Sequence, residues 1–384
     1  MKNEIRDIFP RLLMYCFRIF RIEQHKAVFK SFRGIGCGDN PRAVYDEMRK
    51  ERPDYKYIWI TQDMNDSVPG AKMVKHGSIR EIYELATARL WVDNKRKGCW
   101  ASKRKGQLYI QTWHGGVTLK KVEKDAEGSL PAYYIKSAIK DSEMADAMTS
   151  SSRWQSDQYR DAFWFNNTIL EYGLPRSDIF YHDQTVLYNN VRNYFKLPSE
   201  AKILLYAPTF RNNHQTNVYN MDYQMVLSSL TRAFGGEWYV IVRLHPNVAY
   251  KADIIDYNER IINGTAYPIM NELVIASDFL ITDYSSCMFD AMEAGKKAVL
   301  YAPDIEQYVD DRGFYFGIRE LPFPVAENNE ELKDVIDKFD EADYAKKISG
   351  FREQVGLFND GHASERTVKY ILKRIEYKDG YRRK

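Results

Sequence analysis

The stretch from Leu280 to Asp290, which reads LITDYSSCMFD, joins an apolar run to a corner rich in hydroxyl and acidic side chains. The run from Leu273 to Thr282 predicts a buried strand, and the apolar spacing from Ser285 onward predicts a helix. A helix that begins with Ser285 and Ser286 offers unpaired backbone N–H groups, hydroxyl donors and a positive dipole end, which suit a phosphate oxygen. The simpler alternative is that Ser285 only caps the helix, and this corner alone favours the cap.

Length and charge set the class of protein. A chain of 384 residues is long enough for two domains, each with its own core. Its 56 basic and 53 acidic residues leave a net charge of only +3. A field this weak does not predict nucleic acid as a partner, so any basic site must be local.

The cysteines and carboxylates predict no metal or cofactor. Cys16, Cys37 and Cys99 share no CxxC spacing with each other or with Cys287, so neither a zinc site nor a disulfide framework is indicated, and a reducing cytoplasm is expected. Asp283 and Asp290 flank the helix start without further ligand motifs. No GxxxxGK[ST] or kinase-type glycine loop is present, which disfavours an ATP-driven phosphotransferase.

Residues 1–26 form a basic, amphipathic leader. Arginines alternate with apolar side chains from Ile5 to Ile22, and the tail from Lys373 to Lys384 is also basic. Basic and apolar side chains together suit an anionic membrane surface, so we expect peripheral attachment on the inner face of the cell membrane. An ordinary first helix packed on its own domain explains the same pattern, and the two readings carry equal weight. No apolar run is long enough to span a bilayer, and no secretory cleavage site follows the leader.

Residues 27–192 show the first round of strand and helix alternation, which predicts a parallel sheet covered by helices. The residues past the ends of such strands are where ligands bind. The expected strands are residues 27–32, 57–60, 90–92 and 107–113, and the expected helices are residues 42–51 and 78–87.

Residues 193–361 show a second round after a polar, proline-terminated boundary at residues 193–198. The expected strands are residues 203–207, 238–243, 273–282 and 298–301, with a helix at residues 223–234. Residues 362–384 hold a last helix and the basic tail, and that helix is long enough to cross back to the first domain. The fold class is therefore α/β with two doubly wound domains and little beyond them.

His114 is the leading candidate for a general base. It ends a strand and is followed by Gly115 and Gly116, which let backbone or ligand approach the imidazole closely. Lys120 and its basic neighbours could attract an anionic substrate. A turn histidine bonded to backbone is the ordinary alternative, and an isolated His-Gly-Gly sequence favours it.

Two strand ends of the second half carry cationic side chains. Arg211 follows the strand at residues 203–207, and Arg243 and His245 end the strand at residues 238–243. These three could clamp a diphosphate beside Ser285 and Ser286. Each alone is more often a surface residue, but together they favour phosphate binding.

These residues resemble the CDP-glycerol glycerophosphotransferase family, the teichoic-acid and capsule polymerases and primases of bacteria. The resemblance runs from near Phe29 almost to the C-terminus. Its motifs are Ser31-Phe32, Asp39-Asn40-Pro41, Trp113-His114-Gly115, Leu119-Lys120, Gly173-Leu174-Pro175-Arg176 with Asp178, Ala207-Pro208-Thr209-Phe210-Arg211, Arg243-Leu244-His245-Pro246, Thr282-Asp283-Tyr284-Ser285-Ser286, Phe289-Asp290, Arg312-Gly313 and Asp360-Gly361.

The resemblance implies a GT-B architecture, in which two Rossmann-like domains face a cleft and the C-terminal one holds the cytidine nucleotide. It implies that His114 is the base for the acceptor hydroxyl and that His245 steadies the diphosphate. The hydroxyl would attack the β-phosphorus, CMP would leave and a phosphodiester would form. Gly115 and Lys120 would contact substrate in the first domain. The donor site would comprise Arg176, Pro208, Thr209, Arg211, Arg243, Ser285, Ser286 and Asp290.

Several alternatives stay open at this point. Gly116-Val117 and Gly295-Lys296-Lys297 depart from the family's usual Thr-Pro and Lys-Pro, which leaves CDP-glycerol or CDP-ribitol as donor and a lipid-linked or oligosaccharide polymer as acceptor. A GT-B sugar-nucleotide glycosyltransferase shares the fold and the basic corners. A non-catalytic protein that binds a polyanion or a membrane is the rival from another class.

Overall fold

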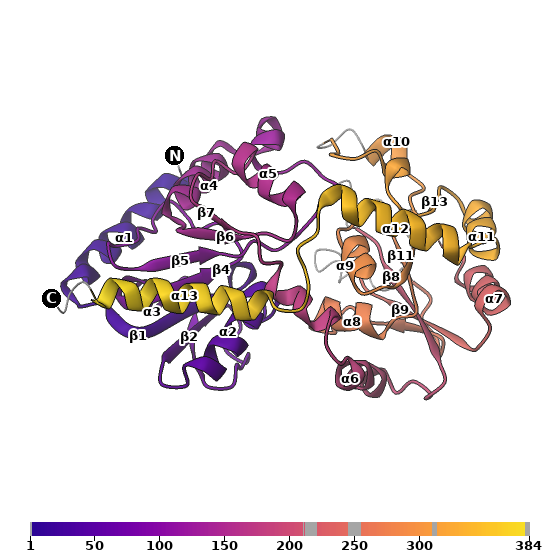
Figure 1. Cartoon of the computed structure of the whole chain (residues 1–384), viewed down its shortest axis with the longest axis horizontal. Helices are drawn as coiled ribbons and strands as arrows, with labels where there is room; N and C mark the ends of the chain where they lie inside the picture. Colours follow the sequence, from indigo (N-terminus) through magenta and orange to yellow (C-terminus); the bar gives the residue numbers. More distant parts are fainter. Residues whose placement is uncertain (1, 210, 212–220, 245–254, 309–312, 381–384) are drawn as a thin grey trace. The chain divides into compact units, whose positions relative to one another are not determined.

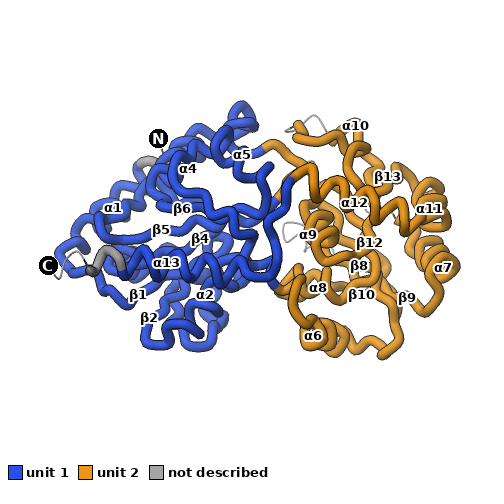
Figure 2. Tube along the Cα trace, in the orientation of Figure 1, with its two compact units in different colours: residues 1–116, 122–178, 356–384 blue, residues 117–121, 179–355 orange. Residues whose placement is uncertain are grey.

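The computed structural model describes residues 2–209, 211, 221–244, 255–308 and 313–380. These residues divide into two compact units (Figure 2). Unit 1 comprises residues 1–116, 122–178 and 356–384, and unit 2 comprises residues 117–121 and 179–355. The chain therefore enters unit 2 directly after Gly116, returns, and leaves unit 1 again after Asp178.

The described part of unit 1 forms a seven-stranded sheet in which every paired strand is parallel, in the order β3-β2-β1-β4-β5-β6-β7 (Figure 1). The strands are β1 (Glu23–Lys30), β2 (Lys56–Thr61), β3 (Ala71–Lys75), β4 (Ala88–Asp93), β5 (Leu108–Gln111), β6 (Ala147–Thr149) and β7 (Thr168–Leu170). Successive side chains point to opposite faces, so Phe29 joins one core and Val28 the other. Both faces are buried, as a parallel sheet requires.

Helices cover both faces of this sheet. Helices α2 (Asp39–Glu51) and α13 (Ala363–Gly380) pack on the face of Phe29. Helices α1 (Lys2–Cys16), α3 (Ile79–Thr87) and α5 (Arg153–Asp161) pack on the face of Val28. The remaining helices of unit 1 are α4 (Ala132–Met144) and the short 3₁₀ turns η1 (Phe17–Ile19), η2 (Phe32–Gly34) and η3 (Glu123–Ser129), while η4 (Pro175–Phe180) spans the passage into unit 2.

Unit 2 repeats the design around a six-stranded parallel sheet, in the order β10-β9-β8-β11-β12-β13 among the residues described. Its strands are β8 (Lys202–Ala207), β9 (Trp238–Val242), β10 (Ile261–Asn263), β11 (Phe279–Thr282), β12 (Lys297–Tyr301) and β13 (Val325–Ala326). Its helices are α6 (Thr185–Phe195), α7 (Tyr223–Phe234), α8 (Met270–Ala276), α9 (Cys287–Glu293), α10 (Ile305–Tyr308), η7 (Ile318–Glu320), α11 (Asn329–Asp337) and α12 (Glu341–Val355).

Both sheets share the strand order of a dinucleotide-binding fold. The first strand of each half, β1 or β8, lies between the second and fourth strands, and the order reverses there. This confirms the predicted class: α/β, with the two Rossmann-like doubly wound domains of a GT-B protein. Ligands of such folds bind beyond the carboxyl ends of the strands at the reversal. Ligand sites are therefore expected beyond the carboxyl ends of β1 and β4 in unit 1, and of β8 and β11 in unit 2.

One predicted strand was wrong. Residues 273–282 form the end of α8 (Met270–Ala276) and then β11 (Phe279–Thr282), separated by Ser277 and Asp278. Helix α8 is buried from Leu273 to Ala276, so its apolar run lacks the polar face that marks a surface helix. Periodicity alone cannot distinguish a short buried helix from a buried strand.

The division into units also differs from the predicted boundaries. It falls after Asp178 rather than after residue 192, because α6 packs against α8 of unit 2. Residues from Gly356 onward belong to unit 1, where α13 packs beside α2, although the second domain was expected to extend to residue 361.

The leader forms α1, which packs on α3 in unit 1. No helix within the described ranges has the length and hydropathy needed to span a membrane.

Candidate functional site

His114 lies at the carboxyl edge of the unit 1 sheet, just past β5. Its Nδ1 is 2.9 Å from the backbone carbonyl of Asn94, which follows the neighbouring strand β4. A carbonyl only accepts, so Nδ1 carries the proton and Nε2 carries the lone pair. Nε2 is 2.9 Å from the ammonium of Lys95, which donates to it. The imidazole is thus held as the tautomer that a base acting through Nε2 requires.

The pKa of His114 is unusually low. Burial, and next the positive charge of Lys95, lower it to about 3. The imidazole is therefore neutral across the physiological range, and it is a weak base while the Lys95 ammonium occupies Nε2. Burial and then the charge of Arg33 also lower the pKa of Lys95, to about 8, so Lys95 remains mostly protonated at neutral pH. Sequence reasoning missed Lys95, although it follows the end of a predicted strand.

Strained backbone surrounds the imidazole. Phe32, Arg33, Asp39 and Trp113 all have positive φ values, of 44°, 59°, 63° and 52°. The rings of Phe32 and Trp113 lie 5.9 Å and 4.3 Å from that of His114. A bulky residue in this region costs of order 1 kcal/mol or more, and such strain concentrates at functional sites.

Two buried asparagines stabilise this strained arrangement. The Asn94 side chain accepts from the N–H of Phe32 at 2.7 Å and donates to Asp39 at 2.9 Å. The Asn40 side chain donates to the carbonyl of Trp113 at 3.1 Å and accepts from the N–H of Arg176 at 3.0 Å. The loops after β1 and β5 are thereby joined at the reversal of strand order. The motif Asp39-Asn40-Pro41 is thus part of the His114 environment.

Arg176 lies in unit 1, whereas the other described residues that the resemblance assigns to the donor site lie in unit 2. Its guanidinium is 3.4 Å from Asp39, and its charge contributes to the low pKa of His114. The sequence could not show this, because Gly173 to Asp178 precede the second domain without revealing which unit they join.

The two glycines after His114 differ. A side chain at Gly115 would meet nothing within 4 Å, whereas a Cβ at Gly116 would lie 2.7 Å from the Ser151 hydroxyl oxygen. Gln155 accepts from that hydroxyl at 2.8 Å and donates to the carbonyl of Gly115. Gly116 therefore permits close packing of the loop, and Gly115 adjoins open space.

In unit 2, Asp283 organises the loops after β8 and β11. Its carboxylate accepts from the N–H and the hydroxyl of Thr209, each at 2.8 Å, and from the N–H of Tyr284 at 2.6 Å. The same carboxylate lies 2.8 Å from the Arg211 guanidinium. Because β8 and β11 are adjacent at the reversal of strand order, these loops form the expected ligand edge of this sheet.

The Arg211 side chain is 4% exposed, and its guanidinium is already paired with the carboxylates of Asp283 and Asp304. It donates to Asp304 at 2.6 Å and 3.0 Å and to Thr209 at 2.7 Å. Its guanidinium also lies 4.6 Å from the centre of the Tyr308 ring, which stacks on Tyr284. In this structure Arg211 orders the corner and does not present a free cation to a diphosphate. Asp304 was missed, although it follows β12, the strand next to β11.

Lys120 belongs to this corner, because residues 117–121 are part of unit 2. Its ammonium donates to the Tyr308 hydroxyl at 2.5 Å, and its backbone forms an antiparallel bridge with Phe314. The structure thus places Lys120 beside the Tyr308 and Tyr284 stack of unit 2.

The remaining predicted donor residues occupy different settings. Arg243 donates through one guanidinium nitrogen to the carbonyls of Gly264, Thr265 and Tyr267, so it braces the loop after β10. Ser286 precedes α9 without a side-chain cap bond, and Ser285 accepts weakly from the N–H of Cys287 at 3.4 Å. The simple cap predicted for Ser285 is therefore a poor description of this helix start. Pro208 adjoins Thr209, and Asp290 is buried within α9.

His245 lies outside the described residues, as do Pro246 and Phe210. Among the residues that are described, no group of three or more His, Cys, Asp and Glu side chains is placed to hold a metal ion. The four cysteines are all free thiols.

Comparisons with known proteins identify relatives of the chain. The model of the family described as CDP-Glycerol:Poly(glycerophosphate) glycerophosphotransferase matches residues 12–373. A teichoic acid poly(glycerol phosphate) polymerase of Bacillus subtilis is 31% identical over 97% of this chain and 52% of its own length. A teichoic acid ribitol-phosphate primase of Bacillus spizizenii is 28% identical over 96% of each chain.

A solved structure of the wall teichoic acid polymerase TagF is 29% identical, with a TM-score of 0.83 over 98% of each chain. The chain spans about half the length of the curated relatives that it matches at 31% and 32% identity.

Proposed function

Because the chain belongs to the CDP-glycerol:poly(glycerophosphate) glycerophosphotransferase family, we propose that it transfers a polyol phosphate from a CDP-polyol to an acceptor hydroxyl. The product is a phosphodiester and the leaving group is CMP. The names of its relatives, which include polymerases and a primase of teichoic acid, support a teichoic-acid or capsule-type polymer as acceptor. The CDP-polyol carries its own activated phosphate, so the proposal needs no cofactor.

The single observation that carries this proposal is the state of His114. Its Nδ1 proton is committed to the Asn94 carbonyl, which leaves the Nε2 lone pair for a hydroxyl. In the proposed step Nε2 takes the hydroxyl proton while the oxygen attacks the β-phosphorus, and the bond from that phosphorus to the CMP oxygen breaks. The hydroxyl must replace the ammonium of Lys95 at Nε2, and the displaced ammonium then carries its positive charge beside the phosphate.

Unit 2 supplies the donor site in this proposal. Ser285 is half-buried and Ser286 is exposed at the corner that Asp283 and Arg211 hold in place. An ordered corner lowers the entropy lost when a diphosphate binds. Arg243 and His245 would complete the site from the loop after β9.

Product identity tests the reaction. We expect the chain to release CMP from CDP-glycerol or CDP-ribitol when acceptor is present, and His114→Asn to reduce the rate at least a hundredfold, because general-base catalysis contributes that much. His25→Asn is the matched control, since His25 is an exposed histidine paired with Asp54. Release of a nucleoside diphosphate from a sugar nucleotide would instead establish a glycosyltransferase. Full transfer by His114→Asn would refute the role of the imidazole.

A direct comparison of CDP-glycerol with CDP-ribitol tests which polyol the donor carries. We propose CDP-glycerol as the first candidate, because that donor describes the family. A ribitol-phosphate primase among the relatives keeps CDP-ribitol as the second. The ratio of kcat/KM for the two donors, measured with one acceptor, separates them.

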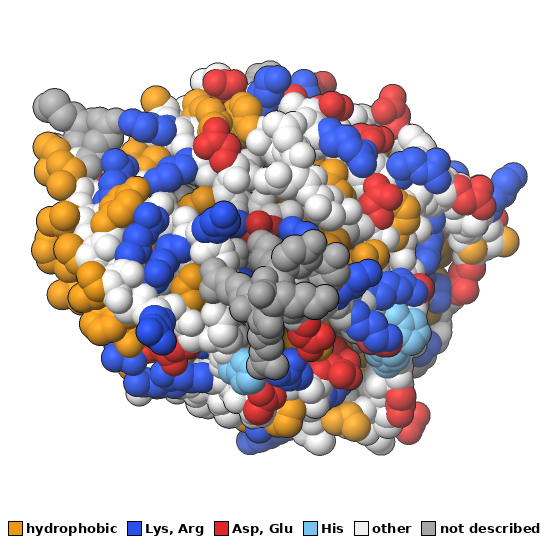
Figure 3. Space-filling model, turned by 60° about the vertical axis from the view of Figure 1, so that its left-hand side comes forward, with side chains coloured by type: hydrophobic (Ala, Val, Ile, Leu, Met, Phe, Trp, Pro, Cys, Tyr) orange, Lys and Arg blue, Asp and Glu red, His pale blue; other side chains and the backbone are white. Residues whose placement is uncertain are grey.

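We also propose that α1 docks on an anionic membrane surface. Ile5, Ile8, Phe9 and Leu12 are each about 60% exposed, and they recur at helical spacing on one side of α1. Asp7 and Met14, on the other side, are buried. Figure 3 shows hydrophobic side chains gathered along one edge of the face it displays, with Lys and Arg side chains beside them. Four free thiols are consistent with the cytoplasmic side of that membrane.

Co-sedimentation with vesicles tests the docking. We expect Ile8→Glu with Leu12→Glu to release the protein from vesicles rich in phosphatidylglycerol, because two charges would enter the apolar contact. Val186→Glu is the control, since Val186 is 68% exposed on α6 in unit 2. Undiminished sedimentation of the α1 variant would contradict the docking.

A further inference from the structure

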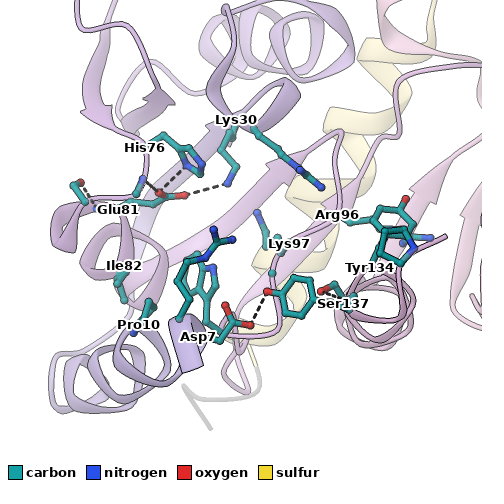
Figure 4. Close-up of a pocket in the computed structure, with 18 residues that line it drawn as sticks. Asp7, Pro10, Lys30, His76, Glu81, Ile82, Arg96, Lys97, Tyr134 and Ser137 are labelled. Carbon is teal, nitrogen blue, oxygen red and sulfur yellow. Dashed lines mark hydrogen bonds and ion pairs between the residues drawn. The ribbon is translucent and has the colours of Figure 1, made fainter. Parts of the chain in front are cut away.

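A cavity of about 650 Å³ opens beyond β1 and β4 in unit 1 (Figure 4). These strands are neighbours at the reversal of strand order, where ligands of doubly wound sheets bind. Its size falls within the usual range for small-molecule sites, about 300–1,000 Å³. Its walls come from α1, the start of α3, the loop after β4, and α4.

Fixed cations line the inner wall of the cavity. Lys30 is 3.0 Å from Glu81, Lys97 is 2.7 Å from Asp93, and Arg96 is 3.2 Å from Glu123. All three cations are at most 6% exposed. The carboxylates of Glu81, Asp93 and Glu123 balance the charges of these cations. The ion pairs therefore form part of the cavity wall and do not by themselves indicate an anionic ligand.

Two exposed arginines of the lining are different. Arg6 of α1 and Arg33 after β1 line the cavity, and within the described residues neither side chain has a carboxylate partner or a hydrogen bond. Both are exposed, so they keep their charge and can turn toward a ligand. Planar guanidinium groups bind phosphate oxygens in pairs, so an anionic phosphate group is the ligand that they fit.

The apolar part of the lining suits the carbon skeleton of a polyol. Trp100, Ile82 and Pro10 line the cavity, and Tyr133 and Tyr134 add rings whose hydroxyls are already bonded to Asp7 and Glu123. Rings with satisfied hydroxyls present mainly apolar faces to the cavity, which pack against the C–H surface of sugars and polyols.

The cavity shares its inner boundary with the catalytic site. Arg33 directly follows Phe32, whose ring contacts the His114 ring edge-on. The guanidinium of Arg96 lies 5.3 Å from the Trp113 ring, which in turn contacts His114. The charge of Arg33 also acts on Lys95, the partner of His114. A ligand that contacts Arg33 or Arg96 in the cavity is therefore separated from His114 by the side chain of Phe32 or of Trp113.

We infer that this cavity binds the polyol-phosphate end of the acceptor, with Arg33 and Arg6 on its phosphodiester and the Trp100 wall against its polyol. The inference rests on the proposed transfer, with a teichoic-acid type of acceptor that already carries polyol phosphate units. It assigns the acceptor to unit 1 alone and leaves unit 2 to the nucleotide. It also makes Arg33 a binding residue that contacts acceptor and not donor.

Equilibrium binding of a soluble tri(glycerol phosphate) to the full chain tests the inference. We expect Arg33→Gln to raise the Kd about tenfold, because it removes one charge-assisted contact, and Arg6→Gln to act in the same direction. The affinity of wild type should fall with added salt. Arg160→Gln is the matched control, because Arg160 is an exposed arginine of α5 in unit 1 outside the cavity. CDP affinity should be equal in all four proteins.

The outcomes separate the two proposals. Unchanged oligomer binding by Arg33→Gln, or an equal loss of CDP binding, would overturn the inference. Phosphatidylglycerol carries the same glycerol phosphodiester, so its vesicles are tested as competitors in the Ile8→Glu with Leu12→Glu variant, in which α1 is expected not to dock. Vesicles that abolish oligomer binding in that variant would also overturn the inference, in favour of a lipid headgroup. If the oligomer binds as expected but no CMP is ever released from a CDP-polyol, the proposed transfer fails and the cavity assignment stands.

Discussion

At the scale of single residues, the pair formed by Lys95 and His114 decides how the base responds to pH. The pKa of His114 in the folded chain is about 3, against an ordinary value near 6.5. Between these values the unfolded chain binds a proton that the folded chain does not. The stability contributed by neutral His114 is therefore complete above about pH 6.5 and is lost progressively as the pH falls toward 3.

Removing the neighbouring charge should raise the pKa of His114. We expect Lys95→Met to move it upward from about 3, though not to 6.5, because burial is the larger cause of the shift. NMR titration of the His114 ring measures the pKa directly. Lys97→Met, which removes a buried cation paired with Asp93, controls for a general loss of charge. An unchanged titration in Lys95→Met would mean that the 2.9 Å contact does not persist in solution.

The glycine pair allows a second test at this scale. Gly116→Ala should destabilise the chain by about 1–3 kcal/mol, since its Cβ would overlap the Ser151 hydroxyl, and Ser151→Gly in the same chain should recover most of that loss. Gly115→Ala should change stability little, because it meets open space at an ordinary backbone conformation. Chemical denaturation of the wild type and these three variants measures the changes in stability. Equal effects at the two positions would contradict the packing described.

Part of this chemistry could be predicted from residue types. His114 before two glycines and the serines after β11 stand out as polar residues at strand ends, and the structure places both at carboxyl edges of their sheets. Lys95 and Asp304 also follow strands, but nothing in their local sequence separates them from surface charges. Their importance comes from which strands are neighbours, which pairing across the sheet determines and local sequence does not.

At the scale of elements, the ion pairs of Arg211 join the ends of β8, β11 and β12. Arg211→Met should therefore lower the free energy of unfolding of unit 2 by about 3–5 kcal/mol, because it leaves Asp283 and Asp304 buried without their cation. Arg319→Met should cost less than about 1 kcal/mol, because its pair with Glu327 is mostly exposed. Urea unfolding of both variants gives the comparison. A loss of CDP binding in Arg211→Met without a loss of stability would instead show that Arg211 contacts the diphosphate itself.

Element boundaries show where sequence reasoning reaches its limit. Helix α7 begins and ends where predicted, at residues 223 and 234, because Asp222 caps it and a glycine follows it. Helix α8 was predicted as a strand, since burial on all sides removes the periodicity that identifies a helix. The join between α6 and unit 2 depends on packing against α8, which is a contact distant in sequence.

At the scale of the whole molecule, the two units have separate cores and, in our proposals, separate ligands. Phe29 and Val28 anchor the two cores of unit 1, and Leu204 and Ile281 belong to that of unit 2. A ligand stabilises the unit that binds it by mass action, about 2.7 kcal/mol at a hundred times its Kd. Donor and acceptor should therefore protect different parts of the chain from hydrogen exchange.

We expect CDP to slow amide exchange in peptides covering residues 202–209 and 279–290, and tri(glycerol phosphate) to slow it in peptides covering residues 30–34 and 93–100. Helix α12 of unit 2 is the internal reference for the donor, and α13 of unit 1 is the reference for the acceptor, because neither lies at a proposed site. Hydrogen exchange with mass spectrometry resolves these peptides. Protection of residues 30–34 by CDP alone would place the nucleotide in unit 1 and exchange the roles of the two sheets. Protection of each set by its own ligand would show that unit 1 holds the acceptor independently of the donor.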